Sequence, residues 1–485
     1  MNLLIDVSGD RMVPPVDQVL IDQRGPRKGR SVVFAVPAPL VRHGLRRMTP
    51  SSTARRSARQ RRIYGVVISL STARSKVKFS RLLLVWPTTV ARMRGDRLRV
   101  LWLRGPSGVG KSSVGWEMFT QLSRMGVRTG FVDSDQISLF LPEPEGGTHR
   151  LRARNLAAMW PNFRAAGMQC LILSGYVDTP AEVREYTELL PDAAFTLCRL
   201  RAEPAELKRR FIDRGWRPDL VDEAVAEAEA LDRSDITDMY VETDGTTVSE
   251  VARIIREQVD GWPRATPAVR PSGLVAGPPT APVGVSPTSA RVPVLWLSGA
   301  TAVGKSTVGY EVYSQVVRAG VPAAYVDLKQ IGALRPAADD DPGRHYLKAH
   351  NLAAILAGHR EAGARFLVVS GDADGDEAVR SYADLLPGTA LTVCRLHAGP
   401  AALAERVAQR GGGHGPAIPG DGIKGLDADG LHRIAEQAAR EAAALDRAGA
   451  GDLRVDTDGR SVHDVVGQIR ALIGGQQGPS SSPFP

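Results

Sequence analysis

Short apolar runs alternate along the chain with longer segments whose apolar residues have helical spacing. The runs Val100–Leu103, Gly130–Val132, Cys170–Leu173 and Ala194–Leu197 contain almost no polar residues. Such runs predict parallel strands that are buried on both faces. The segment from Val248 to Val259 has the periodicity of an amphipathic helix. Alternating strands and helices indicate an α/β fold with a doubly wound, parallel sheet.

The same series of patterns occurs again about 200 residues later. Val294–Leu297 repeats the first strand, and Val462–Ile473 repeats the closing helix. Further matching segments are Phe131–Asp133 with Tyr325–Asp327, Arg154–Ala158 with His350–Ala354, Leu173–Gly175 with Val369–Gly371, and Glu242–Gly245 with Asp456–Gly459. A period of this length is too long for a solenoid and predicts tandem duplication of a whole domain.

The repeats and the composition divide the chain into five segments. We expect a basic segment of low structure over residues 1–95, a first domain over 96–262 and a divergent second domain over 291–474. Residues 263–290 are rich in Pro, Gly and Ala, which is typical of a semi-extended linker. Residues 475–485 are expected to be a disordered tail.

Charge is distributed unevenly between these segments. The chain has a formal net charge of +9, but residues 1–95 hold 19 Lys and Arg against 4 Asp and Glu, and the remainder is mildly acidic. The first segment has three interpretations: a disordered basic arm, a transit peptide, or sequence upstream of a natural start near Met93. Early acidic residues such as Asp6 and Asp10 argue against the transit peptide. The acidic remainder gives no support for nucleic-acid binding.

The three cysteines form no CxxC pair, so neither a zinc site nor a disulfide framework is indicated. No run of 18 apolar residues occurs, and we therefore expect no membrane span. A reducing, cytoplasmic location fits this cysteine usage. The excess of Arg over Lys, together with abundant Ala, Gly and Pro, suggests a bacterial gene.

A glycine-rich loop follows the first strand of each repeat. Gly105–Ser112 and Gly299–Ser306 both match the pattern G-x-x-x-x-G-K-[ST], the Walker A motif. In this motif the loop amides and the helix N-terminus bind phosphate, the lysine bridges the β- and γ-phosphates of ATP, and the hydroxyl binds Mg²⁺. The candidate nucleotide-binding residues are Gly105, Gly108, Gly110, Lys111, Ser112 and Ser113 in the first repeat, and Gly299, Gly304, Lys305, Ser306 and Thr307 in the second. Ser112 and Ser306 are also candidate Mg²⁺ ligands.

Acidic residues follow the second strand of each repeat. The first repeat has Asp133 and Asp135, whereas the second has Asp327 followed by Lys329. A carboxylate at this position could hold the metal, for which Asp133 and Asp327 are candidates, or accept a proton from a substrate hydroxyl. The alternative is that these residues form a turn or a helix N-cap.

Two basic clusters occur later in each repeat. Arg210 and Arg214 have the same i, i+4 spacing as Arg406 and Arg410, which places both guanidinium groups on one helix face. They are candidates for closing on ATP, or alternatively for surface ion pairs. The other cluster includes Arg152 and Arg154 in the first repeat and His345, Lys348 and His350 in the second. It could bind a charged substrate or form a solvated helix face.

The doubled loop, the D-x-D segment and the late arginines together resemble the small-molecule P-loop kinases. That group includes shikimate, gluconate and adenylylsulfate kinases and chloramphenicol phosphotransferase. The resemblance implies that Asp133 and Asp135 approach the acceptor and the metal, and that the arginine pairs belong to a lid. The strand before Ser174 and Ser370 ends without an acidic Walker B residue, which favours kinase-like proteins over motor ATPases. Of the two aspartates of the D-x-D segment, only the first has an acidic counterpart in the second repeat, Asp327.

The leading hypothesis is therefore ATP-dependent phosphotransfer to a small hydroxyl-bearing molecule, with Lys111, Asp133, Asp135, Arg210 and Arg214 in the catalytic set. The alternatives are a nucleotide-binding sensor and a slow ATPase coupled to a partner protein. Lys329 and the glycines after Arg410 make the second repeat suitable for a sensor. The sequence identifies neither the acceptor nor the oligomeric state.

Overall fold

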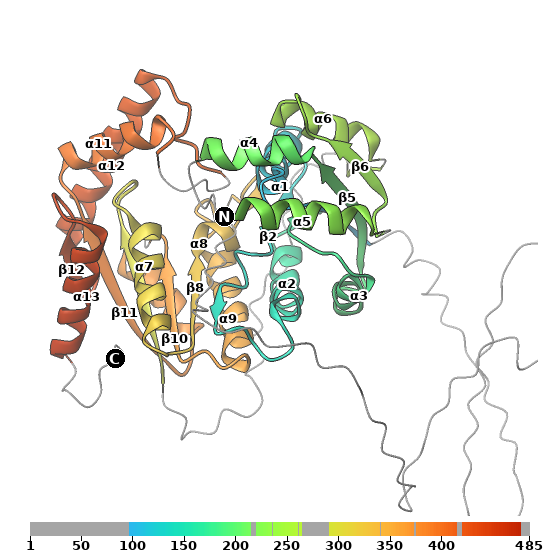
Figure 1. Cartoon of the computed structure of the whole chain (residues 1–485). Coiled ribbons are helices and arrows are strands. Elements are labelled where there is room, and N and C mark those ends of the chain that lie inside the picture. Colours follow the sequence, from blue (N-terminus) through green and yellow to red (C-terminus); the bar gives the residue numbers. More distant parts are fainter. Residues whose placement is uncertain are drawn as a thin grey trace, which may run out of the picture. The chain divides into compact units, whose positions relative to one another are not determined.

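The computed structural model describes residues 97–214, 220–234, 236–259, 261–263, 291–339, 341–372, 375–414 and 420–476. The basic segment 1–95 and most of the expected linker and tail therefore lie outside the described residues. The described chain forms two successions of strands and helices, which we call the first half (97–263) and the second half (291–476) (Figure 1).

Strands and helices alternate in the first half. Its strands are β1 (Leu98–Arg104), β2 (Thr129–Asp133), β3 (Phe140–Leu141), β4 (Cys170–Ser174), β5 (Ala193–Arg201) and β6 (Met239–Glu242). Its helices are α1 (Lys111–Arg124), α2 (Thr148–Ala165), α3 (Pro180–Leu189), α4 (Pro204–Arg214), α5 (Val221–Asp232) and α6 (Val248–Gln258). The four expected strands and the closing helix are thus confirmed.

The second half follows the same order with one additional short helix. Its strands are β7 (Val292–Gly299), β8 (Ala323–Asp327), β9 (Leu334–Arg335), β10 (Phe366–Ser370), β11 (Thr389–His397) and β12 (Leu453–Asp456). Its helices are α7 (Lys305–Arg318), α8 (Leu328–Ile331), α9 (His345–Glu361), α10 (Asp376–Asp384), α11 (Pro400–Gly411), α12 (Ala428–Ala448) and α13 (Val462–Gln476). In the described residues, no helix has both the length and the apolar character needed to cross a bilayer.

The strands form two six-stranded sheets of matching topology. Their orders are β6-β5-β1-β4-β2-β9 and β12-β11-β7-β10-β8-β3. The first five strands of each order pair in parallel, which confirms the expected α/β class. Strands that follow β1 in the sequence lie on both sides of it in the sheet, and the same holds for β7. A crevice therefore opens beyond the carboxyl ends of β1 and β7, where open α/β sheets bind ligands.

Side chains along the central strands alternate between two cores. In β1, Val100 and Trp102 pack on one face of the sheet, while Leu101 and Leu103 pack on the other. Helices α1 and α6 cover the face of Leu101 and Leu103, and α2 and α3 cover the face of Trp102. In the second half α7 and α13 lie side by side on one face of the sheet (Figure 1). Both faces of the sheet are buried, which is why the middle positions of the central strands are mostly apolar.

The sixth strand of each sheet comes from the other half of the chain. Phe140 and Leu141 of β3 pair antiparallel with Ala324 and Ala323 of β8. In return, β9 pairs antiparallel with Thr129 and Gly130 of β2. The halves therefore exchange short edge strands reciprocally, an arrangement that the sequence analysis did not predict.

Helices α2 and α9 pack against each other between the two sheets. The residues around them form one hydrophobic cluster with members in both halves, such as Leu156 and Leu352. The Nδ2 of Asn162 also donates a hydrogen bond to Oδ1 of Asn351 at 2.9 Å. This shared core joins the halves more extensively than the exchanged strands alone.

Candidate functional site

Both glycine-rich loops connect a central strand to the N-terminus of a helix. Gly110 and Gly304 are the N-caps of α1 and α7, with φ of 103° and 106°. At the third variable position, Gly108 has φ of 82° and its counterpart Ala302 has φ of 63°. These left-handed conformations turn the chain so that successive backbone amides can face a common centre. The loops therefore have the backbone geometry of an anion-binding nest in both halves.

Each loop lysine is buried and folded back over its own loop. Lys111 Nζ donates to the carbonyls of Gly105 and Pro106 at 2.8 and 3.0 Å. Lys305 Nζ donates to Gly299 and Ala300 at 2.7 and 2.9 Å. Burial lowers the pKa of Lys111. A buried ammonium held by the carbonyls of its own loop is well placed to bind an incoming phosphate.

The loop serines contact the acidic residue at the end of the second strand. Ser112 Oγ donates to Asp133 Oδ2 at 2.6 Å, and Ser306 Oγ donates to Asp327 Oδ2 at 2.8 Å. The last residue of β4 joins the first pair, since Ser174 Oγ lies 3.2 Å from Ser112 Oγ. The last residue of β10 joins the second, since Ser370 Oγ donates to Asp327 Oδ2 at 3.2 Å. Burial raises the pKa of Asp133, and the neighbouring Asp135 carboxylate raises it further. The carboxylate is thus prepared to accept a proton or a cation.

This donor set suits a magnesium ion. Hydroxyl and carboxylate oxygens are ligands that Mg²⁺ prefers, and Ser112 with Asp133, or Ser306 with Asp327, would hold it beside the phosphates. No group of three or more His, Cys, Asp or Glu in the described part of the chain could hold a metal. Few protein ligands are needed, because Mg²⁺ commonly keeps waters and shares phosphate oxygens.

A glutamate from a later helix caps each loop. The amide of Ser107 donates to Oε2 of Glu227 on α5 at 2.6 Å, and the amide of Thr301 donates to Oε2 of Glu441 on α12 at 2.8 Å. The carboxylate therefore accepts a hydrogen bond from an amide that would otherwise donate to a bound phosphate. Sequence reasoning missed this pair. A signal existed, because both glutamates stand four residues before a shared Leu-Asp-Arg.

The candidate lid arginines have different surroundings. Arg210 donates to the carbonyls of Val109 and Thr243, and Arg406 donates to the corresponding Val303 and Thr457. These two guanidinium groups connect the loop to the turn after the last strand. Arg410 instead pairs with Asp421 at 2.7 Å. The helix α4 ends at Arg214, whose side chain lies outside the described residues.

In the first half, the second acidic residue is held by an arginine. Arg152 Nη2 lies 2.5 Å from Asp135 Oδ1, and both side chains are largely buried. Burial lowers the pKa of Arg152, but Asp135 together with Tyr186, Asp133 and Glu182 outweighs this effect and raises it. Arg154 is exposed and does not join them. Of these two basic residues, Arg152 therefore contacts the acidic pair and Arg154 does not.

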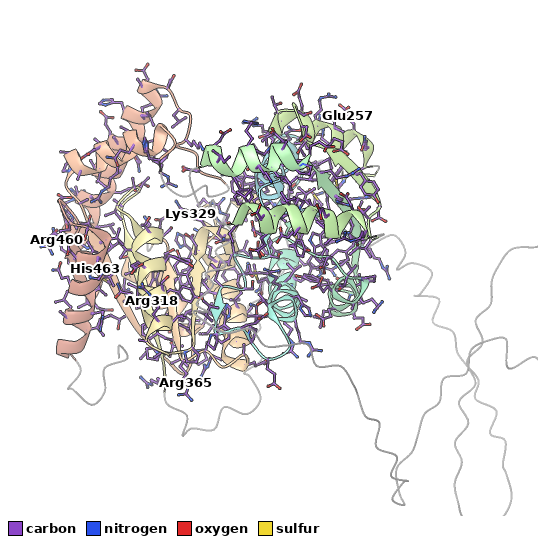
Figure 2. All side chains as sticks on the ribbon, in the orientation of Figure 1. Glu257, Arg318, Lys329, Arg365, Arg460 and His463 are labelled. Carbon is purple, nitrogen blue, oxygen red and sulfur yellow. The ribbon has the colours of Figure 1, made fainter. Side chains whose placement is uncertain are left out.

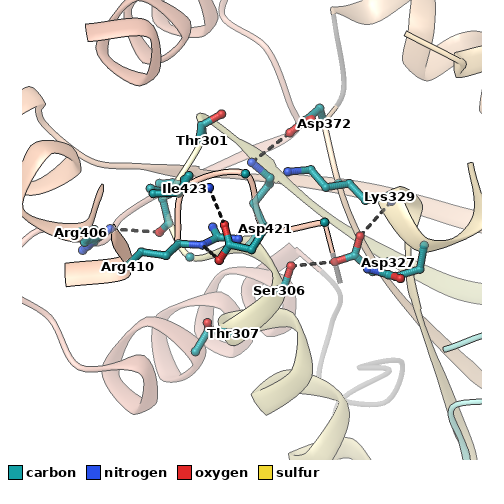
Figure 3. A pocket seen from close by; sticks show the side chains of 18 of the residues that line it. Thr301, Ser306, Thr307, Asp327, Lys329, Asp372, Arg406, Arg410, Asp421 and Ile423 are labelled. Carbon is teal, nitrogen blue, oxygen red and sulfur yellow. Dashed lines mark hydrogen bonds and ion pairs between the residues drawn. The ribbon is translucent and has the colours of Figure 1, made fainter. Parts of the chain in front are cut away.

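The second half has exchanged the charges at this point (Figure 3). Lys329 replaces Asp135, and Asp372, which sequence reasoning missed, stands where the first half has Tyr176. Asp372 Oδ1 lies 3.0 Å from Lys305 Nζ. Burial alone would raise the pKa of Asp372, but Lys305, Lys329 and Lys348 outweigh it and hold it at about 2.

A cavity of about 630 Å³ opens over the second loop. Its walls include Lys305, Ser306 and Thr307 at the start of α7, Arg410 of α11 and Asp421 before α12, and Asp327 and Lys329 from the end of β8 and from α8 (Figure 3). First-half residues Trp116 and Phe119 also line it. Lys329 lies at the carboxyl end of the second sheet and Arg365 at the opposite end (Figure 2). The cavity thus brings residues of the glycine-rich loop together with the charged residues that follow β8.

Comparison with known proteins gives weak likenesses only. No family model matches the chain, and no curated protein matches it. Partly similar solved structures include APS kinase of Mycobacterium tuberculosis, with 18% identity over 33% of this chain and 97% of that chain and a TM-score of 0.27. A gluconokinase from Sinorhizobium meliloti has 16% identity over 39% and 100%, with a TM-score of 0.26. Shikimate kinase from Acinetobacter baumannii has 18% identity over 34% and 95%, with a TM-score of 0.24. At these values none of them assigns an activity to this chain.

Proposed function

We propose that the chain binds ATP and Mg²⁺ at both glycine-rich loops and transfers the γ-phosphate to a small hydroxyl-bearing molecule in the first half. The observation that carries this proposal is the contact of Ser112 with Asp133 beside the buried Lys111. It brings together a phosphate ligand, a metal ligand and a carboxylate within one crevice. The loop geometry alone would support binding, whereas the carboxylates support transfer.

Each residue has a role that follows from its position. Lys111 would hold the β- and γ-phosphates, while Arg210 positions the loop through Val109. Asp133 or Asp135 would orient the acceptor hydroxyl and receive its proton as the oxygen attacks phosphorus. Bound Mg²⁺ would neutralise charge on the phosphate oxygens. Arg214 would complete the site from the lid.

The second half favours a different use of the nucleotide. Lys329 stands in place of Asp135, and Asp372 pairs with the loop lysine. Nucleotide binding without transfer is therefore the second candidate function, with the second half serving as a sensor. A slow ATPase would need no acceptor at either site.

We also infer that the halves arose by duplication of one domain, with boundaries near 96–262 and 291–474. The matching strand orders and the paired contacts of Lys111 and Lys305 support this inference. The reciprocal exchange of β3 and β9 would follow if the ancestor were a symmetric dimer.

The first test uses the full chain and γ-labelled ATP. Product formation would be measured against a set of small hydroxyl compounds. Lys111→Ala removes the phosphate-bridging cation, and we expect transfer to fall by about 100-fold or more. Lys305→Ala is the matched control, since it alters the second loop and should leave first-half transfer within a few-fold of the original.

Undiminished transfer in Lys111→Ala would reject the proposal. Tight ATP binding without labelled product from any acceptor would favour the sensor. Phosphate release in the absence of an acceptor would favour the ATPase.

A further inference from the structure

The acceptor side of the second-half cavity is far more cationic than the matching part of the first half. We define this acceptor side by five residues, Lys329, Arg335, Arg344, Lys348 and Asp372, all of which line the cavity. By alignment of the two halves, the corresponding first-half residues are Asp135, Leu141, Thr148, Arg152 and Tyr176. The first-half set has one acid and one base, whereas the second-half set has four bases and one acid.

The bases of this set outnumber the acid within it. The one acid of the set, Asp372, already pairs with the loop lysine Lys305. Burial and then the like charge of Arg335 lower the pKa of Arg344, although Asp341 opposes the effect. The Nε of Arg344 is buried and has no hydrogen-bond partner. Clustered cations that are partly removed from water are costly unless an anion joins them.

The backbone at Arg344 places this guanidinium beside the cavity. Arg344 has φ of 57° and is the N-cap of the 17-residue helix α9. The left-handed conformation is uncommon for a residue with a side chain. The positive end of α9 adds to the charge of Arg344 and favours an anion at the same place.

The first half contributes an aromatic wall to the same cavity. Trp116 and Phe119 of α1 line it, and the Arg335 guanidinium lies 5.3 and 5.4 Å from their ring centroids. Gly420, which precedes α12, packs directly on the indole of Trp116, because a Cβ at this glycine would lie 2.3 Å from Cζ2 of that ring. The aromatic surface therefore contacts both Arg335 and Gly420.

We infer that the acceptor side of this cavity binds a small anionic molecule, one with a phosphate, sulfate or carboxylate group held by Lys329, Arg344 and Lys348. A planar part of the same molecule would lie against Trp116. The site is composite, since its cations come from the second half and its aromatic wall from the first. The inference does not depend on phosphotransfer in the first half, because it concerns equilibrium binding at the other loop.

The test measures anion binding to the full chain with both loops saturated by Mg²⁺ and a non-hydrolysable ATP analogue. The probes are inorganic phosphate and phenyl phosphate, titrated at constant ionic strength and followed by thermal stabilisation. Lys329→Asp and Arg344→Thr install the first-half residues. We expect each to weaken phosphate binding by about tenfold or more, since a hydrogen bond to a charged group is lost. Phenyl phosphate should bind more tightly than phosphate, and Trp116→Ala should remove that advantage.

Arg365→Thr is the matched control. It removes one exposed positive charge at the opposite end of the second sheet (Figure 2) and should leave both affinities unchanged. Each variant is compared with itself in the absence of the probe, so a change in its own stability does not affect the result. The inference is overturned if phosphate fails to stabilise the original chain, or if Lys329→Asp and Arg344→Thr bind it as the original does. First-half transfer is measured separately, so either proposal can fail alone.

Discussion

At the scale of single residues, the matched glutamates Glu227 and Glu441 have the clearest mechanistic consequence. Each carboxylate accepts a hydrogen bond from a loop amide that would face a phosphate. While no phosphate is bound, such a carboxylate accepts the hydrogen bond that a loop amide would otherwise donate to the phosphate. It must move, or tolerate like-charge repulsion, when ATP enters. The glutamates should therefore tune nucleotide affinity without touching the reaction centre.

The change Glu227→Gln tests this role, since the amide oxygen can still accept from Ser107 while the charge is removed. We expect ATP to bind the first half about fivefold more tightly, which corresponds to about 1 kcal/mol. Equilibrium titration in a Lys305→Ala background isolates the first loop. Glu229→Gln, which alters an exposed residue of the same helix, is the control. Weaker binding by Glu227→Gln would show that the carboxylate assists the nucleotide instead.

At the scale of elements, the contact of α2 with α9 contains a buried histidine. His359 is fully buried, and neither of its ring nitrogens has a hydrogen-bond partner. Phe140 of the exchanged strand β3 lies 6.0 Å from it between ring centroids. Burial lowers the pKa of His359 from 6.5 to about 3. The aligned first-half residue is Phe163, so an apolar side chain suits the same position.

This histidine predicts a pH-dependent stability. Its folded pKa lies below its unfolded pKa, so the unfolded chain binds the additional proton. The buried neutral imidazole therefore adds its full contribution to the free energy of unfolding above about pH 6.5. This contribution is lost as the pH falls toward the pKa of the folded state. The free energy of unfolding should fall by about 1 kcal/mol per pH unit over this range. His359→Phe should flatten the profile between pH 6.5 and 5 in thermal unfolding. Parallel profiles for the two proteins would contradict the assignment.

Elements with a strong local pattern could be predicted from the sequence, and paired edges could not. The run Val100–Leu103 predicted a buried strand because both of its faces meet a core, and β1 contains it. The strands β3 and β9 have two residues each, too few to show any periodicity. Their partners lie between 182 and 206 residues away in the chain. Only the folded arrangement determines such pairing.

The candidate site shows the same division. Motif spacing predicted Lys111 and Ser112, since their chemistry requires fixed positions on one strand–loop–helix unit, and the end of the next apolar run predicted Asp133. Asp372 and Arg344 carry no motif and act through charge and burial, which a single sequence does not show. Arg210 was predicted to close on ATP from the spacing of the arginines alone, and its hydrogen bond to the loop carbonyl of Val109 is a contact that only coordinates reveal.

At the scale of the whole molecule, the two halves depend on each other. Each sheet lacks its sixth strand without the other half, and one hydrophobic cluster spans both. The second-half cavity also takes aromatic residues from the first half. A single chain thus has the reciprocal strand exchange that is expected of a symmetric dimer. Separating the halves should expose apolar surface on α9 and an unpaired edge on β8.

Expression of residues 291–476 alone tests this dependence. We expect the isolated second half to form a homodimer, because its own β9 and α9 can occupy the places of β3 and α2 from the first half. Its mass would be measured by light scattering after size exclusion, at micromolar concentration. Gly358→Leu is the control, because a Cβ at Gly358 would already lie 2.2 Å from Asn155 Oδ1, and a larger side chain should block the helix contact. A stable monomer of the unaltered half, with helix content retained, would show that α9 needs no partner and that the shared core is dispensable.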